Sequence, residues 1–282
     1  MKKILITGST GFIGSYLTKR LLNKYEVIVI LRKKNKKIQK IISKKNVIIY
    51  KNFIDLDNKL SPLKIDYVIH CATHYVKEHK VFDIKKLSNT NIAYGNILLE
   101  NLKKLNVKKF INFSTVWEDY NGKKNYPNNL YAFYKKCFSE LIKYYSNKNN
   151  VKFYNLMISD TFGHNDKRKK LINLLNHNYK KNITTNIISS NLRMNLLSVN
   201  DIFRAVKIIL DKNIPPSSYT LIGNFYNIKN IIDSFNLKNK KKIKVKYLSK
   251  KIIIEKIYRY KKLPNWCLEH SSINEIFKII KA

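Results

Sequence analysis

Short runs of apolar residues alternate along the chain with longer segments in which apolar residues recur every three or four positions. The short runs indicate buried strands, because a strand covered on both faces has few polar positions. They fall at residues 4–7, 26–31, 47–50, 66–71, 109–113 and 151–158. Helical spacing fills most of the gaps, at residues 12–23, 87–105 and 130–146. This alternation predicts an α/β fold, a doubly wound parallel sheet with helices on both faces.

The first apolar run leads into a turn that is rich in glycine. Residues 8–14, Gly-Ser-Thr-Gly-Phe-Ile-Gly, hold three of the seven glycines in the chain, at Gly8, Gly11 and Gly14. A tight turn, close backbone approach and helix packing each exclude a Cβ atom at such positions. The next helix directs its N–H groups and positive dipole end at the turn, which suits a pyrophosphate. Strand, turn and helix together predict a dinucleotide site in a Rossmann-type domain.

The pattern becomes less regular after about residue 160. The elements predicted there are a helix at 200–211, a strand at 217–222 and helices at 250–262 and 272–281. We expect a dinucleotide-binding Rossmann domain over residues 1–158 and a smaller α/β substrate lobe over residues 159–282, with some crossing of the chain between them. Such a lobe would bind substrate at the carboxyl edge of the sheet.

Composition and charge limit the classes of function. With 282 residues, 44% of them hydrophobic, the chain can bury a sizeable core. The formal net charge of +38 comes from 56 basic residues, of which only six are arginine, so that 50 lysines are spread along the chain. Arginine is the residue that most often hydrogen-bonds to base edges and binds phosphates in a bidentate way. We therefore expect no specific nucleic-acid binding, but a general attraction for anionic substrates.

No segment points to a membrane, an oxidising compartment or a metal. No apolar run approaches the roughly 18 residues of a membrane span, and no cleavable signal precedes the first strand. Neither paired nor metal-type spacing is found among the cysteines, which are Cys71, Cys137 and Cys267. His70, His74 and His79 lie close in sequence, but no carboxylate or thiol completes a metal site. We expect a cytoplasmic protein with free thiols, no membrane insertion and no metal.

A tyrosine and a lysine one helical turn apart form the candidate catalytic pair. Tyr131 and Lys135 open the helix predicted at 130–146, and residues i and i+4 share one helix face. A nearby ammonium lowers the pKa of a phenol, so Tyr131 can act as general acid or base. Thr115 ends the preceding strand, where its hydroxyl could hold a substrate carbonyl oxygen. The alternative is two residues on a solvated helix face.

Five motifs occur in an order and spacing that are more specific than any one of them. They are Gly8-x-x-Gly11-x-x-Gly14, Asp66-Tyr-Val-Ile-His-Cys-Ala72, Asn91 with Glu100, Ser114-Thr115 and Tyr131-x-x-x-Lys135. This combination resembles the extended short-chain dehydrogenase/reductases, the NAD-dependent epimerase/dehydratase family, over nearly the whole chain. Residues 113–166 are most similar to the sugar-nucleotide 4-ketoreductases of the CDP-abequose synthase group.

The resemblance implies a role for each matching residue. Thr115, Tyr131 and Lys135 would be catalytic. The residues implied in cofactor binding are Gly8, Thr10, Gly11, Phe12, Ile13, Gly14, Asp55, Leu56, Cys71, Ala72, Thr73, Asn91, Tyr131 and Lys135. Within that set the turn would hold pyrophosphate, and Asp55 with Leu56 would flank adenine. Asn91 would be a structural or proton-relay residue, with an ordinary helix-surface amide as the alternative.

The end of the second strand indicates which dinucleotide binds. NAD-preferring relatives carry an acid there that takes the ribose hydroxyls, whereas this chain has Leu31, followed by Arg32 and Lys33. Without a carboxylate to repel it, and with two cations adjacent, a 2′-phosphate is favoured. We therefore predict NADP(H) in preference to NAD(H).

The departures from the family pattern concern the substrate. Dehydratase relatives follow the catalytic threonine with Asp-Glu, where this chain has Val116-Trp117, so dehydration is not expected. Glu118 and Asp119 are interpreted as loop charges, one of which could reach the substrate. The candidate substrate contacts are Asp160, Arg168 and Arg193, with simple surface charges as the alternative for the two arginines.

The leading hypothesis is an NADPH-dependent reductase of a nucleotide-diphosphate 4-keto-deoxysugar, used for a surface polysaccharide such as O-antigen. An NAD-dependent nucleotide-sugar 4-epimerase is the alternative among enzymes. A non-catalytic dinucleotide-binding or RNA-associated scaffold is the alternative from another class. The resemblance also implies a homodimer, formed through the helices at 87–105 and 130–146.

Overall fold

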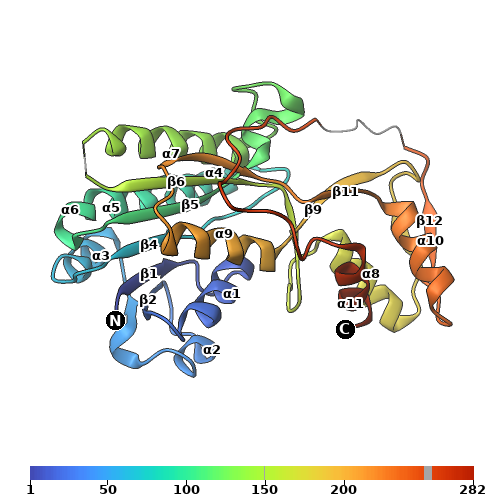
Figure 1. Cartoon of the computed structure of the whole chain (residues 1–282), viewed down its shortest axis with the longest axis horizontal. Coiled ribbons are helices and arrows are strands. Elements are labelled where there is room, and N and C mark those ends of the chain that lie inside the picture. Colours follow the sequence, from blue (N-terminus) through green and yellow to red (C-terminus); the bar gives the residue numbers. More distant parts are fainter. Residues whose placement is uncertain (149, 251–255) are drawn as a thin grey trace. The chain divides into compact units, whose positions relative to one another are not determined.

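The chain forms two compact units in a computed structural model that describes residues 1–148, 150–250 and 256–282 (Figure 1). The first unit comprises Met1–Met157, Ile209–Thr220 and Ile257–Lys262. The second comprises Ile158–Ile208, Leu221–Lys256 and Leu263–Ala282. Two later segments of the chain therefore return to the first unit.

A seven-stranded sheet forms the centre of the first unit. Its order is β10-β6-β5-β4-β1-β2-β3, and the ladders from β3 to β5 are parallel. The strands are β1 (Lys3–Thr7), β2 (Glu26–Leu31), β3 (Val47–Ile49), β4 (Tyr67–His70), β5 (Lys109–Thr115), β6 (Lys152–Ile158) and β10 (Ser217–Leu221). The order reverses between β1 and β4, which is the place where open α/β sheets bind ligands.

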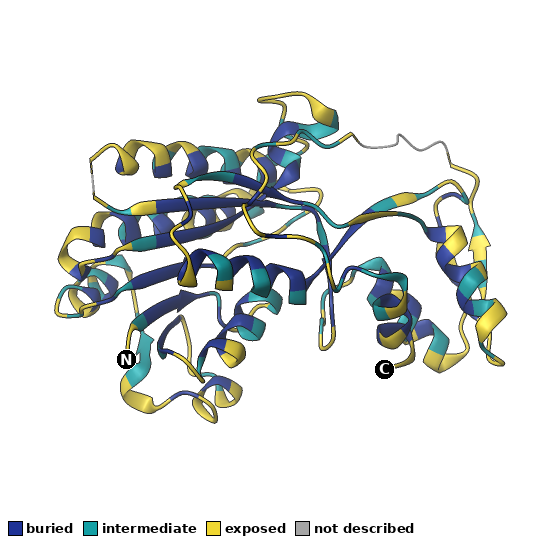
Figure 2. Cartoon of the chain, in the orientation of Figure 1, coloured by how far each residue is buried: buried dark blue, intermediate teal, exposed yellow. Residues whose placement is uncertain are grey.

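Helices cover the sheet because their apolar residues recur on one face. Those of the first unit are α1 (Phe12–Leu21), α2 (Lys36–Gln39), α3 (Phe53–Leu60), α4 (Val81–Ser88), α5 (Tyr94–Glu100), α6 (Leu102–Leu105) and α7 (Leu130–Ser146), with a π-helical turn at Asn89–Ala93. Side chains of α3, α5, α6 and α7 share one buried cluster with the strands. Figure 2 shows these strands dark blue and the outer helix faces exposed.

The second unit has its own core and smaller sheets. A three-stranded sheet orders β11 (Asn224–Asn227), β9 (Arg193–Ser198) and β7 (Asp160–Phe162), and β8 (Thr185–Ile187) pairs with β12 (Val245–Tyr247). The helices α8 (Leu171–Lys181), α10 (Ile228–Lys238) and α11 (Ile273–Lys281) supply most of the buried apolar cluster. The helix α9 (Val199–Asp211) contributes residues to both units.

The structure confirms the predicted fold class and the six predicted strands of the N-terminal half, and the helix at 130–146 agrees at both ends. The helix predicted at 250–262 is wrong wherever it can be assessed, since residues 256–262 form no helix and 251–255 lie outside the described residues. Here Lys261 bridges Tyr219, and the Tyr260 N–H donates to Thr220 Oγ1 at 2.6 Å. Hydrogen bonds along β10 thus replace those of a helix.

Two further expectations concern thiols and membranes. All three cysteines are free thiols, as predicted. Among the described ranges, no helix combines the length and the apolar character needed to cross a bilayer.

Candidate functional site

The turn after β1 has a backbone path that only glycine can follow. Gly8 has φ +66°, and a Cβ placed there would come within 2.6 Å of the Ala72 nitrogen. A Cβ on Gly14 would lie 2.2 Å from the Gly8 carbonyl oxygen. The Gly11 N–H donates to that same oxygen at 2.9 Å. The predicted glycine positions therefore form one tight loop, pressed against the segment that follows β4.

The loop presents the N-terminus of α1. Gly11 is the N-cap, and no side chain provides a capping hydrogen bond. The first-turn amides and the helix dipole therefore favour an anion at this end. Thr10 and Gly11 are exposed, and Phe12 and Ile13 are half-buried. The geometry fits the pyrophosphate of a dinucleotide.

His70 ties the end of β4 to the end of β1. Its Nδ1 lies 2.9 Å from Thr7 Oγ1, which in turn accepts from the Ala72 N–H at 3.1 Å. Burial and, to a smaller extent, the charge of Lys135 lower the pKa of His70 to about 3. His70 is therefore neutral at physiological pH, and its ring forms a hydrogen bond with the Thr7 hydroxyl. Its role in the structure is to hold the segment against which Gly8 packs.

The low pKa of His70 predicts a loss of stability in acid. Between pH 6.5 and 3 the unfolded state binds a proton that the folded state does not, so the free energy of unfolding falls as pH decreases. By pH 5 the penalty is about 2 kcal/mol. In His70→Gln, urea unfolding should lose about 2 kcal/mol less than the wild type between pH 7 and 5. Exposed His177→Gln should follow the wild type; parallel curves for His70→Gln would contradict the assignment.

Tyr131 and Lys135 lie in the first two turns of α7, which Asn129 caps by accepting from the Ala132 N–H at 2.9 Å. The Tyr131 ring is half-buried and packs edge-on against Tyr75, with centroids 5.1 Å apart. The Lys135 side chain lies on the buried face and Lys135 is only 3% exposed. The two are therefore not on a fully solvated helix face.

The Lys135 ammonium reaches the carboxyl end of β4. Burial lowers the pKa of Lys135 to about 8, while Glu118 and Cys71 act in the opposite direction. Lys135 in turn lowers the pKa of both His70 and Cys71, although burial keeps the Cys71 thiol neutral. Since a Cβ on Gly8 would also touch the backbone of Cys71 and Ala72, the helix with the candidate pair lies beside the glycine loop.

Thr115 ends β5 and is buried, at the same carboxyl edge of the sheet. Its Oγ1 accepts from the Trp117 N–H at 3.2 Å. Because that contact uses the oxygen as an acceptor, the hydroxyl proton can be donated to a substrate oxygen. Trp117 also lies near Tyr75, with ring centroids 6.2 Å apart, so the residues after β4, after β5 and at the start of α7 meet.

Asn91 holds the loop after β4. It is 2% exposed, so the alternative of a surface amide is wrong. Its Oδ1 accepts from Thr73 Oγ1 at 3.0 Å and from the His74 N–H at 2.7 Å, and its Nδ2 donates to the His74 carbonyl at 2.9 Å. A role in cofactor binding stays a prediction for Cys71, Ala72, Thr73 and Asn91.

The expected adenine contacts lie in α3. Asp55 accepts from the Lys51 N–H and from Lys59 Nζ, both at 2.8 Å, and so supports the first turn of the helix. Leu56 is fully buried in the core. With no exposed surface, Leu56 cannot touch a base unless α3 moves. The adenine role of Asp55 and Leu56 stays a prediction.

Arg32 and Lys33 follow β2 and are both exposed. The Arg32 charge lowers the pKa of Tyr50, Tyr94 and His74, which places it near the ends of β3 and β4. Within the described ranges, neither Arg32 nor Lys33 pairs with a carboxylate. Both cations can therefore meet an anionic ligand without breaking an ion pair.

The candidate substrate residues belong to the second unit. Asp160 pairs with Lys170 Nζ at 2.8 Å, and Arg168 Nη2 contacts Asp166 and Thr161 Oγ1, each at 2.8 Å. Arg168 thus holds its own loop together, with a side chain that is 38% exposed. Arg193 is exposed at the start of β9. Contacts of Asp160, Arg168 or Arg193 with a substrate stay predictions.

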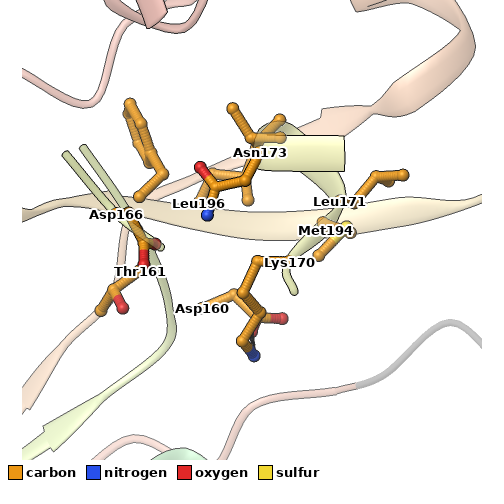
Figure 3. Close-up of a pocket in the computed structure, with 10 residues that line it drawn as sticks. Asp160, Thr161, Asp166, Lys170, Leu171, Asn173, Met194 and Leu196 are labelled. Atoms are coloured by element: carbon orange, nitrogen blue, oxygen red, sulfur yellow. Dashed lines mark hydrogen bonds and ion pairs between the residues drawn. The ribbon is translucent and has the colours of Figure 1, made fainter. Parts of the chain in front are cut away.

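Figure 3 shows a cavity beside Asp160. Its volume is about 10 Å³, the space of about one water molecule. The lining residues are Asp160, Thr161, Phe162, Asp166, Lys170, Leu171, Ile172, Asn173, Met194 and Leu196. This cavity is too small for a sugar, and we assign no substrate to it.

Glu118 and Asp119 are not loop charges, and that interpretation is wrong. Glu118 is fully buried and accepts from the hydroxyls of Ser114 and Ser139. Asp119 is also buried, bonded to the Tyr260 hydroxyl and 3.5 Å from Lys136 Nζ. The one signal in the sequence is Ser139, a polar residue on the apolar face of α7. The buried carboxylates otherwise depend on a kink in the turn at Val116–Gly122.

Three comparisons place this geometry among known proteins. The sequence model of the NAD dependent epimerase/dehydratase family matches residues 4–227. The chain is 29% identical over 214 residues to CDP-abequose synthase from Yersinia pseudotuberculosis, covering 75% of this chain and 74% of the relative. It is 30% identical over 277 residues to dTDP-D-glucose 4,6-dehydratase from Dictyostelium discoideum, covering 86% of this chain and 62% of the relative.

Among solved structures, the fold is similar to UDP-glucuronic acid 4-epimerase from Bacillus cereus in complex with UDP-glucuronic acid and NAD. The TM-score is 0.79 at 21% identity, over 99% of each chain. At this identity the likeness concerns the fold alone.

Proposed function

The chain belongs to the NAD dependent epimerase/dehydratase family, and from this premise we propose that it reduces a nucleotide-diphosphate 4-keto-deoxysugar with NADPH. As a member of the extended short-chain dehydrogenase/reductases it is an NAD(P)-dependent oxidoreductase or epimerase. The observation that carries the proposal is that Thr115, Tyr131 and Lys135 lie at the sheet edge beside the glycine loop. The similarity to CDP-abequose synthase supports the choice of a ketone substrate.

The side chains would divide the chemistry among three roles. The bound dinucleotide would supply the hydride. Tyr131 would donate its phenolic proton to the oxygen that becomes an alkoxide, while Thr115 donates a hydrogen bond to that oxygen. Lys135, buried one helical turn from Tyr131, would stabilise phenolate and so make Tyr131 the stronger acid. Dehydration is not part of the proposal, because Val116-Trp117 follows Thr115 in place of two acids.

The test is a screen of CDP-, dTDP-, GDP- and UDP-sugars by thermal shift with each dinucleotide, since a preferred ligand raises the melting temperature by mass action. We expect one class of sugar nucleotide, together with NADPH, to raise the melting temperature most, and a turnover assay with the corresponding 4-keto-sugar nucleotide to oxidise NADPH stoichiometrically. No redox turnover, together with salt-sensitive RNA binding, would instead favour a non-catalytic scaffold.

A nucleotide-sugar 4-epimerase is the second candidate, because the fold is similar to a 4-epimerase solved with NAD. In an epimerase the same Tyr131 would accept and return a proton while the cofactor is regenerated within one turnover. Such an enzyme purifies with bound NAD and needs none added. Consumption of added NADPH decides between the two.

The end of β2 predicts the cofactor preference. We expect kcat/KM to be higher with NADPH than with NADH, and Arg32→Ala to raise the KM for NADPH about tenfold, through loss of one charge-assisted contact with a 2′-phosphate. The KM for NADH should change little. Lys36→Ala, another exposed cation, in α2, is the matched control. A clear preference of the wild type for NADH would refute the assignment.

The remaining proposals concern the pathway, the location and the oligomeric state of the protein. We propose a cytoplasmic enzyme whose deoxysugar product is used for a surface polysaccharide such as O-antigen. A homodimer is proposed through α5, α6 and α7, which correspond to the helices named for it in the sequence. Exposed Phe133 on α7 is consistent with a partner there. Sedimentation at micromolar concentration tests the dimer.

A further inference from the structure

A connected layer of buried polar side chains lies between the sheet and α7 in the first unit. Asn112 Nδ2 donates to Asn155 Oδ1 at 2.7 Å, Asn155 Nδ2 to Ser139 Oγ at 3.0 Å, and Ser139 Oγ to Glu118 Oε1 at 3.1 Å. Every member is buried. Burying polar groups costs stability unless they form hydrogen bonds. The surrounding core is apolar and would be stable without this polar layer. The layer ends at a carboxylate, Glu118.

The Glu118 carboxylate lies against the turn of α7 that contains Lys135. Ser139 Oγ bonds both to Glu118 Oε1 and, at 3.0 Å, to the Lys135 carbonyl, and Ser114 supplies a second hydroxyl to the same carboxylate. A buried carboxylate needs an opposite charge as well as hydrogen bonds. Lys136 is 3.5 Å from Asp119, whereas in the described part of the chain no carboxylate is within ion-pair distance of Lys135. Two charges favour the ionised Glu118 carboxylate, that of Lys135 more strongly than that of Lys136.

We propose that Glu118 is a positioning residue of the active site, whose carboxylate, fixed by Ser114 and Ser139, keeps the buried Lys135 side chain charged and in place for Tyr131. This inference rests on the proposed function, because it concerns the same proton transfer. Glu118 acts through Lys135 and does not itself touch the substrate.

The electrostatics of the pair have a definite sign. Burial raises the pKa of Glu118 and lowers that of Lys135, and each charge favours the ionised form of the other. Lys136 from α7 also lowers the pKa of Glu118, and neighbouring Asp119 raises it. His70 and Cys71 face Lys135 from β4 and the residue after it. Removing the Glu118 charge must therefore lower the pKa of Lys135.

The experiment compares Glu118→Gln with Asp119→Asn, a matched change at the next residue, which is equally buried but bound to Lys136 and Tyr260. Lysine labelled with ¹³C at Cε reports the charge of Lys135 by NMR, and the resonance is assigned by its loss in Lys135→Met. Glu118→Gln should lower the pKa of Lys135 by about one unit or more. The alkaline limb of the kcat profile should move to lower pH by the same amount, with KM little changed.

The outcomes separate this inference from the proposed function. If the wild type turns over no sugar nucleotide, the proposed function fails, while the NMR titration still tests Glu118. A Lys135 pKa that is unchanged in Glu118→Gln, or that falls equally in Asp119→Asn, overturns the inference. If Glu118→Gln does not fold, Ser139→Ala takes its place. Loss of the Ser139 hydroxyl disfavours the ionised form of Glu118, so the pKa of Lys135 should again fall, but by less than in Glu118→Gln. An unchanged Lys135 pKa in Ser139→Ala would overturn the inference.

Discussion

Replacing Tyr131 with phenylalanine should lower kcat by at least about a hundredfold and leave the affinity for NADPH near the wild-type value. The phenylalanine keeps the ring that packs against Tyr75, with centroids 5.1 Å apart, but has no proton to donate. The turn around Gly8 and Gly14, which we propose binds the pyrophosphate, is untouched. Stopped-flow absorbance at 340 nm measures the hydride step, and quenching of protein fluorescence measures binding.

Tyr134→Phe is the matched control, since it removes a hydroxyl one turn away on the same helix. It should retain most of the activity. Near-normal turnover by Tyr131→Phe would exclude the tyrosine as the proton donor, and equal losses in the two variants would point to disturbance of α7 instead.

Adding one methyl group at Gly14 should have the second large effect. The Cβ of Gly14→Ala would lie 2.2 Å from the Gly8 carbonyl oxygen, a backbone atom with no freedom to rotate away. Relief of such a contact has to displace the loop, and overpacking of this kind costs about 3 kcal/mol or more. We expect a lower urea midpoint and loss of the thermal stabilisation by NADPH, because the amides at the start of α1 move with the loop.

Gly11→Ala is the control within the same turn. Its Cβ would meet the Gly8 oxygen at 3.2 Å, and its φ of −81° suits any residue. The variant should lose about 1 kcal/mol or less. If Gly14→Ala and Gly11→Ala are equally stable and both bind NADPH, the close approach in the loop is not what the glycines provide.

Most elements of the first unit could be predicted from local signals in the sequence. Each strand from β1 to β6 is a run of apolar residues, and α7 repeats buried positions from Ala132 to Tyr145 at helical spacing. The glycine loop is visible because glycine is rare in this chain. Such features need no knowledge of distant residues, because periodicity and backbone limits act over a few positions.

The second unit was harder because its elements depend on distant partners. The strand β7 has three residues and is paired with β9, more than thirty positions later. The helices α8 and α10 carry many asparagines and lysines, so their apolar stripes are thin. Asn182 ends α8 in a left-handed conformation, with φ 59°, a place that glycine usually marks. Because the chain has only seven glycines, asparagine takes this position, and the helix ends are harder to recognise in the sequence.

The buried acids were missed for a related reason. Whether Glu118 faces water or the core depends on the backbone of the turn, in which Asn121 has φ 54°, and on Ser139 twenty-one positions away. Asp119 depends on Tyr260, 141 positions later. No local pattern contains that information, so a charged pair after a strand was interpreted as a loop.

The return of residues 209–220 and 257–262 to the first unit affects how the protein is made. β10 pairs with β6, so a nascent chain that has emerged only to residue 158 exposes the N–H and C=O groups of β6 as an open edge. The hydrogen bond between buried Asp119 and the Tyr260 hydroxyl likewise cannot form until residue 260 has been synthesised. The first unit can therefore be completed only after residue 262 has left the ribosome, and until then its open edge can pair with other chains.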